Sequence, residues 1–100
     1  MVKKSNSNNI LEQAKKYKTN LIKFMRDLIA IPGESCQEKE VILRIKQEME
    51  KVGFEKITID KMGNIIGKIG KGKKIIAMAT HIDTVGIGSK AEWKFDPYKG

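Results

Sequence analysis

A histidine and an aspartate separated by one residue are the main candidates for chemistry in this chain. His81 and Asp83 lie just after the apolar run Ile75–Ala79. In an extended segment residues i and i+2 point to the same side, about 6.6 Å apart along the chain, so both side chains can face one pocket. A histidine that binds a metal usually donates its other ring N–H to a carboxylate or carbonyl group. Taken alone, however, the pair is more simply interpreted as a strand end followed by a turn.

The single cysteine, Cys36, is the other candidate. We place it in the first turn of an expected helix, where the helix dipole lowers the pKa of a thiol. A catalytic thiol needs a base, and the only histidine lies 45 residues further on. We therefore interpret Cys36 as a helix-start residue without a chemical role. One cysteine cannot form an intramolecular disulfide, which favours a reducing compartment.

The first expected helix covers residues 11–30. Its apolar residues recur at spacings of three, four and seven, the period of one helical face, and predict about five turns. Pro32 lacks a backbone donor and disfavours helical geometry in the residue before it, so the helix ends near residue 30. Thr19 and Asn20 weaken the middle and are a place where the helix could divide.

The second expected helix covers residues 36–52. Ser35 and Glu38 have the types and spacing of a capping box at its start. Gly53 occupies the position after the end, where a left-handed residue is favoured. The expected buried stripe consists of Val41, Ile42, Ile45, Met49 and Val52.

The opposite face of this helix is rich in charge. Glu40 and Arg44 are spaced i,i+4 in the favourable orientation, which predicts a surface ion pair. Glu48 and Glu50 are expected on the solvated face. We therefore do not expect these glutamates to bind metal.

From Phe54 onwards the pattern changes to that of strands and turns. Alternation over residues 57–59 predicts a half-buried strand, and the sequence DKMGN at 60–64 predicts a turn. A second short strand is expected over 65–69. The continuous apolar run at 75–79 predicts a third strand covered on both faces.

The order of two helices and three strands predicts an α/β fold. A central strand needs neighbours and a second helical layer, which the 20 residues after residue 80 are too few to supply. We therefore expect an incomplete sheet, the opening section of a larger domain. Residues 1–9 are interpreted as a polar leader and residues 10–100 as the N-terminal part of a catalytic domain.

The basic charge of the chain does not by itself indicate a nucleic-acid partner. The net charge of +8 comes from 20 basic and 12 acidic residues, but 18 of the basic residues are lysine and they are scattered. Arginine, which clamps phosphates and reads guanines, occurs only at Arg26 and Arg44. No recognition-helix, zinc-finger or RNA-binding pattern accompanies the charge. The alternative hypothesis is a small basic module that binds anionic partners such as nucleic acid. Under the interpretation that we favour, no nucleic-acid partner is expected.

The wider sequence around His81 resembles a known family. The stretch from Ala79 to Val85, ATHIDTV, together with downstream Trp93, Asp96, Pro97 and Tyr98, resembles the first metal-site motif of the co-catalytic zinc amidohydrolases and peptidases. This family contains acetylornithine deacetylase, succinyl-diaminopimelate desuccinylase, aminoacylase and glutamate carboxypeptidases. The resemblance extends back to about Leu21. The HIDTVGIG segment and Ser35-Cys36 are most similar to the branch linked to selenium metabolism.

The resemblance implies hydrolysis of the amide bond of N-acyl amino acids or small peptides at two zinc ions. His81 would be a metal ligand, and Asp83 the catalytic-site carboxylate that orients and polarises it. The loop from Trp93 to Tyr98 would line the site, although core packing is the interpretation we favour for Trp93. The other ligands and the general base would follow Gly100. We therefore expect this chain alone to be inactive and not to bind zinc tightly.

The chain shows no pattern that predicts export or membrane insertion. Its first ten residues lack the apolar segment of a secretory signal. No stretch approaches the 18 or so apolar residues needed to span a bilayer. A cytoplasmic location and a small-molecule substrate are therefore expected. The oligomeric state and the identity of the substrate are not predicted.

Overall fold

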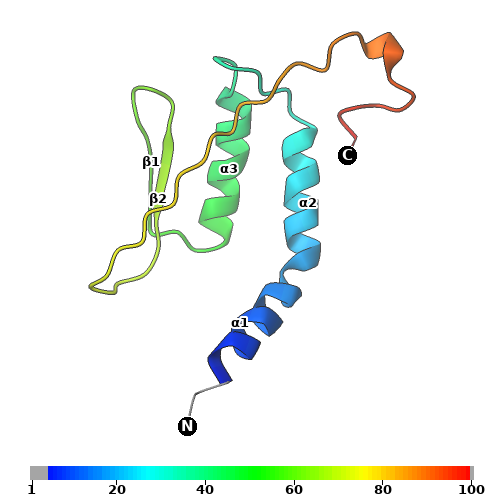
Figure 1. Cartoon of the computed structure of the whole chain (residues 1–100). Helices are drawn as coiled ribbons and strands as arrows, with labels where there is room; N and C mark the ends of the chain where they lie inside the picture. Colours follow the sequence, from blue (N-terminus) through cyan, green and yellow to red (C-terminus); the bar gives the residue numbers. More distant parts are fainter. Residues whose placement is uncertain (1–4, 100) are drawn as a thin grey trace.

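The computed structural model describes residues 5–99 and contains three helices and one β-hairpin (Figure 1). The structure is therefore α/β in content, as predicted. The elements are α1 (Ser5–Lys16), α2 (Lys18–Ile29), α3 (Lys39–Lys51), β1 (Lys56–Ile59), β2 (Ile65–Lys68) and a 3₁₀ helix (Lys90–Glu92).

Helix α3 lies at the centre, between α2 on one side and the hairpin on the other (Figure 1). Among these elements, helix α1 contacts only α2, and it projects from the N-terminal end of α2 (Figure 1). The radius of gyration is 17.3 Å, whereas a compact domain of 100 residues has about 13 Å. The chain is thus open, and much of its apolar surface lacks a covering layer.

The long first helix of the prediction is divided into α1 and α2 at Tyr17. The break lies two residues before Thr19, and the Tyr17 N–H donates to the Ala14 carbonyl at 3.1 Å, one residue short of the helical spacing. Helix α1 begins at Ser5, so residues 5–9 are helical, which the interpretation as a polar leader did not anticipate. Residues 1–4 lie outside the described part. The predicted end of the helix near residue 30, before Pro32, is confirmed, because α2 ends at Ile29.

Helix α3 begins at Lys39, three residues later than predicted. Cys36 has φ of 69°, in the left-handed region, so it cannot belong to a helical turn. Glu38 occupies the N-cap position without a side-chain capping bond. The predicted capping box is therefore wrong, because Ser35 makes a different hydrogen bond, described below.

The end of α3 is formed as the sequence predicts. Gly53 has φ of 90°, and its N–H donates to the Glu50 carbonyl at 3.2 Å. The Phe54 N–H donates to the Met49 carbonyl at 2.9 Å. These two bonds form a Schellman motif, which satisfies carbonyl groups that the helix leaves open.

The core is small and lies at the start of α3. Val41 and Ile42 are 5% and 7% exposed. Ile45 and Met49 are half-buried, whereas Val52 is exposed, so the predicted stripe ends one turn early. Such a small core agrees with the limited burial available to a short chain.

Arg44 joins α3 to α2, instead of pairing with Glu40 as predicted. Its guanidinium donates to Asp27 at 2.8 Å and to Glu48 at 2.9 Å. It also lies over the Phe24 ring, 4.8 Å from the centroid. The side chain of Glu48 is only 14% exposed, so its placement on the solvated face is also wrong.

The predicted hairpin is confirmed. Strands β1 and β2 pair antiparallel, with Ile59 opposite Ile65. The carboxylate of Asp60 accepts hydrogen bonds from the backbone N–H groups of Met62 and Asn64 and from the Asn64 side chain, all within 2.9 Å. These bonds close the turn and hold the pKa of Asp60 below its usual value, with the Asn64 side chain as the largest cause.

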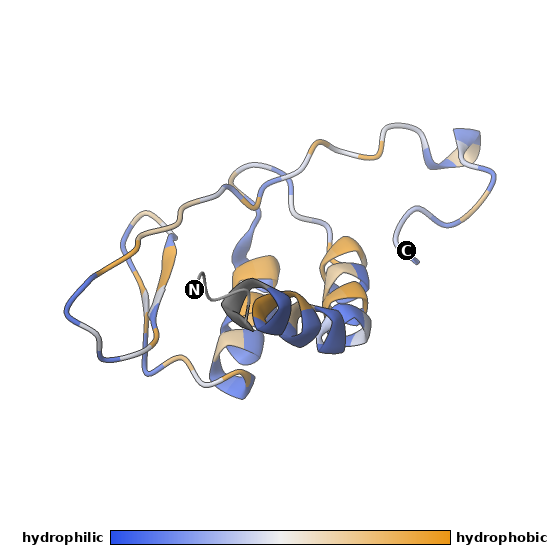
Figure 2. Ribbon diagram, turned by 60° about the horizontal axis from the view of Figure 1, so that its bottom comes forward, coloured by the Kyte–Doolittle hydropathy of each residue, from blue (hydrophilic) through white to orange (hydrophobic). Residues whose placement is uncertain are grey.

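The predicted third strand at residues 75–79 is not formed. This stretch has no ladder partner, and Ile75, Ile76 and Met78 are 83%, 87% and 93% exposed. Figure 2 shows it as an apolar length of open chain that follows the hydrophilic turn after β2. A strand covered on both faces needs neighbours, and none of the segments at residues 5–99 pairs with it. Within the same residues, no helix is long and apolar enough to cross a bilayer.

Candidate functional site

The residues around His81 are held against the loop between α2 and α3. Glu34 and Thr84 form an isolated parallel bridge, and the Thr84 N–H donates to the Gly33 carbonyl at 2.8 Å. Gly33 is buried, and a Cβ atom there would lie 2.8 Å from Val41. Only glycine therefore lets the loop lie this close to α3, and that contact fixes where residues 81–84 dock.

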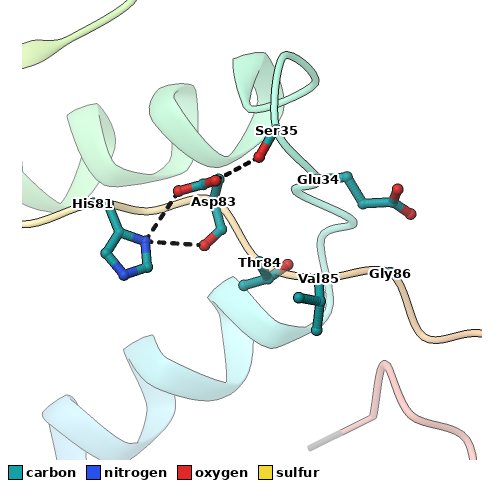
Figure 3. Close-up of a pocket in the computed structure, with 7 residues that line it drawn as sticks. All are labelled: Glu34, Ser35, His81, Asp83, Thr84, Val85 and Gly86. Atoms are coloured by element: carbon teal, nitrogen blue, oxygen red, sulfur yellow. Dashed lines mark hydrogen bonds and ion pairs between the residues drawn. The ribbon is translucent and has the colours of Figure 1, made fainter.

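A chain of hydrogen bonds links three side chains at this junction (Figure 3). The Ser35 hydroxyl donates to Asp83 Oδ2 at 2.5 Å. The other carboxylate oxygen, Oδ1, lies 3.0 Å from His81 Nδ1. The imidazole and the carboxylate thus lie on the same side of the extended segment, as the i,i+2 spacing predicts.

The partners of His81 define its tautomer. Nδ1 lies close to Asp83 Oδ1 and, at 3.2 Å, to the Asp83 carbonyl oxygen. An ionised carboxylate and a carbonyl only accept hydrogen bonds, so Nδ1 must carry a proton. In the neutral ring this leaves Nε2 with a free lone pair, directed away from Asp83 (Figure 3). That is the form in which histidine binds a metal.

The local hydrogen bonds also stabilise the charged form of Asp83. The Ser35 hydroxyl, and then the His81 ring, hold the pKa of Asp83 below its usual value, while partial burial opposes them. Asp83 is therefore an ionised acceptor at neutral pH. Its side chain is 37% exposed, compared with 83% for His81.

These residues line an open pocket of about 720 Å³. Its wall consists of Glu34, Ser35, His81 and residues 83–86. The Glu34 carboxylate points away from the His81–Asp83 pair (Figure 3) and lies beside Gly86. Across residues 5–99, no three side chains of the types that bind metals come together.

The role of Ser35 was not predicted. Its type and its position before an apolar helix indicated a cap, and nothing local shows that its partner lies 48 residues away. Cys36, next to it, is exposed and is not in a helical turn, so the expectation of a thiol acted on by a helix dipole is wrong. No hydrogen bond in the described structure links it to the pair.

The aromatic segment lies apart from this junction. Trp93 is 41% exposed, so its expected place in a core is wrong. Its indole N–H donates to the Ile87 carbonyl at 2.8 Å, and its ring meets Phe95 edge to face at 5.4 Å. These residues line a second depression, with Ile87, Glu92 and Lys94.

Comparison with curated proteins identifies several relatives. Over 91 residues the chain is 59% identical to the Uncharacterized protein YgeY of Escherichia coli (strain K12), covering 91% of this chain and 23% of YgeY. Over 69 residues it is 42% identical to a protein of Pyrococcus abyssi, provisionally named a LysW-lysine/LysW-ornithine hydrolase, covering 68% and 20%. Over 80 residues it is 30% identical to the succinyl-diaminopimelate desuccinylase of Bordetella avium, covering 78% and 21%.

Two of these relatives have the names of hydrolases. Their names support the relationship to amidohydrolases and peptidases that the motif around His81 indicates. The chain spans about a fifth to a quarter of the length of these relatives, between 20% and 23%. No family model matches the chain. No solved structure matches it.

Proposed function

We propose that this chain carries one part of the catalytic site of a zinc-dependent amidohydrolase. The observation that supports the proposal is the contact between His81 Nδ1 and the carboxylate of Asp83, from which the tautomer of His81 is inferred. Nδ1 lies 3.0 Å from Asp83 Oδ1, Nε2 points away from Asp83 (Figure 3), and His81 belongs to the wall of an open pocket. In this proposal His81 binds zinc through Nε2, and Asp83 orients the ring.

The residues present fit a metal site only in part. His81 has the donor chemistry that zinc prefers, but tight binding takes about four ligands, or three and a water. The other ligands and the general base therefore come from residues outside these 100, which agrees with the 20–23% of the relatives' length that the chain covers. When bound, a pair of zinc ions would polarise a carbonyl group and lower the pKa of a water molecule. The chain alone is expected to be inactive.

The substrate class follows from the names of the relatives. A desuccinylase acts on an N-acyl group, so the proposed substrates are N-acyl amino acids or small peptides with an amide bond. The branch linked to selenium metabolism and the cytoplasmic location remain predictions.

The ligand role of His81 can be tested directly, because the chain contains one histidine. Zinc added to a sample with ¹⁵N-labelled histidine should shift the Nε2 resonance and leave Nδ1 protonated. The Cys36→Ser variant should be used throughout, since a free thiolate would compete for zinc. Magnesium, which prefers oxygen ligands, is the control metal. Because one histidine binds zinc only weakly, the titration continues to a large excess of zinc. Zinc bound through Nδ1, or no response at Nε2 even at that excess, would contradict the proposal.

The expected inactivity gives a second test. The purified 100-residue chain, with zinc present, should not hydrolyse N-succinyl or N-acetyl amino acids. Zinc-dependent turnover that is lost in His81→Ala would show that the chain is a complete catalyst, and the division of the site proposed here would be wrong.

A further inference from the structure

The hydroxyl of Ser35 has no local partner and reaches across the fold to Asp83. The bond is 2.5 Å long and joins residues 48 positions apart. Asp83 Oδ2 accepts this bond, while Oδ1 faces His81. Both carboxylate oxygens are therefore engaged, each by a different part of the chain.

A carboxylate without such an anchor does not hold a fixed plane. The terminal torsion of an aspartate side chain is broad, so Oδ1 can leave its place opposite the imidazole at little cost. The imidazole of His81 is 83% exposed, and its only partners in the described structure are the carboxylate Oδ1 of Asp83, at 3.0 Å, and the Asp83 backbone carbonyl oxygen, at 3.2 Å. The orientation of His81 thus depends on the orientation of Asp83.

The position of Ser35 is itself defined by the surrounding backbone. The Gln37 N–H donates to the Glu34 carbonyl at 2.9 Å, which forms a turn around Ser35. Cys36 takes a left-handed φ within this turn, a conformation that costs energy for a residue with a Cβ atom. The bridge between Glu34 and Thr84 brings the turn to the Asp83 segment. The hydroxyl is therefore directed at Asp83 and not at the start of α3.

We propose that Ser35 is a positioning residue: by holding the carboxylate of Asp83, it keeps His81 in the tautomer with the proton on Nδ1 and the lone pair on Nε2. The consequence for zinc binding rests on the function proposed above. The effect on the tautomer does not, because it involves only groups of this chain.

The test reads the tautomer of the single histidine by long-range ¹H–¹⁵N NMR, at a pH where the spectrum shows the neutral ring. The wild-type chain should have the proton mainly on Nδ1. Ser35→Ala should lower the ratio of the Nδ1–H to the Nε2–H form several-fold. Ser35→Thr, which keeps the hydroxyl, should restore it. Ser89→Ala, at an exposed serine with no side-chain capping bond, should leave the ratio unchanged.

A general loss of structure must be separated from a loss of positioning. The amide spectrum of Ser35→Ala should keep the signals of the bridge between Glu34 and Thr84. If the bridge is retained and the tautomer ratio equals that of the wild type, the proposal is overturned. If the bridge is lost in Ser35→Ala, the Ser35→Thr variant becomes the deciding test. A threonine that restores the bridge but not the wild-type tautomer ratio also overturns the proposal.

Failure of the proposed function gives a different pattern. With the Cys36→Ser background, Ser35→Ala should weaken the zinc response at Nε2 by about tenfold or more, the usual effect of removing an outer hydrogen-bond partner. A tautomer that responds to Ser35 without any zinc response would keep the positioning role and reject the metal site. An Asp83→Ala variant with an unchanged tautomer would reject both.

Discussion

Replacing Gly33 with alanine should destabilise the junction between the α2–α3 loop and the core. The new Cβ atom would lie 2.8 Å from Val41 Cγ2, whereas ordinary van der Waals contacts begin at 3.4 Å, so the two groups must separate by at least about 0.6 Å. Val41 is 5% exposed and cannot turn into solvent. Overpacking of this kind costs about 1–3 kcal/mol, and each kcal/mol lowers the Tm of a domain of this size by about 4–8 °C.

The free energy of unfolding can be measured by urea denaturation followed by far-UV circular dichroism. Gly72→Ala is the matched control, because Gly72 also lacks a positive φ and its new methyl group would lie 3.9 Å from the nearest neighbour, the Lys74 carbonyl oxygen. The control should change stability by less than about 0.5 kcal/mol. In a Val41→Ala background the cost of Gly33→Ala should fall, because the clashing methyl is gone. Equal losses for Gly33→Ala and Gly72→Ala would refute the reasoning.

Two further predictions concern other parts of the fold. Arg44→Ala should lower the free energy of unfolding by about 1 kcal/mol, because it removes the ion pair with Asp27 and the cation–π contact with Phe24, which join α3 to α2, and the ion pair with Glu48 within α3. Lys46→Ala, whose partner is 3.8 Å away on an exposed surface, should have almost no effect. Equal effects in urea denaturation would contradict this. The folded-state pKa of Asp60 lies below its ordinary value of 3.8, so the stabilisation that Asp60 gives the hairpin should be fully present above pH 3.8 and be lost as the pH falls through the folded pKa. Cross-strand NOEs between β1 and β2 should report this loss. An Asp60→Asn variant with the same pH dependence would show that Asp60 is not its origin.

The sequence predicted those features whose determinants lie close together along the chain. The hairpin follows from the alternation over residues 57–59, the turn signal DKMGN and the short apolar segment at 65–69. The end of α3 follows from Gly53, one residue after the cap. The contact between His81 and Asp83 follows from the alternation of side chains in an extended segment. Each of these needs only a few neighbouring residues to form.

The predictions that failed depend on segments that are distant in sequence. Arg44 has a favourable partner one turn away in Glu40, yet α2 brings Asp27 and Phe24 to its other side. The apolar run at 75–79 has the composition of a buried strand, but a strand forms only when another segment satisfies its backbone groups. The apolar pattern of this run does not show whether a neighbouring strand is present to pair with it.

The sequence by itself therefore determined the contact between His81 and Asp83, the hairpin of β1 and β2 and the end of α3. The tertiary structure alone decided that Ser35 binds Asp83, because that bond requires Gly33 to lie against Val41 and the Glu34–Thr84 bridge to join segments about 50 residues apart. Side-chain types and spacing encode short-range geometry. The path of the backbone through space decides which distant groups meet.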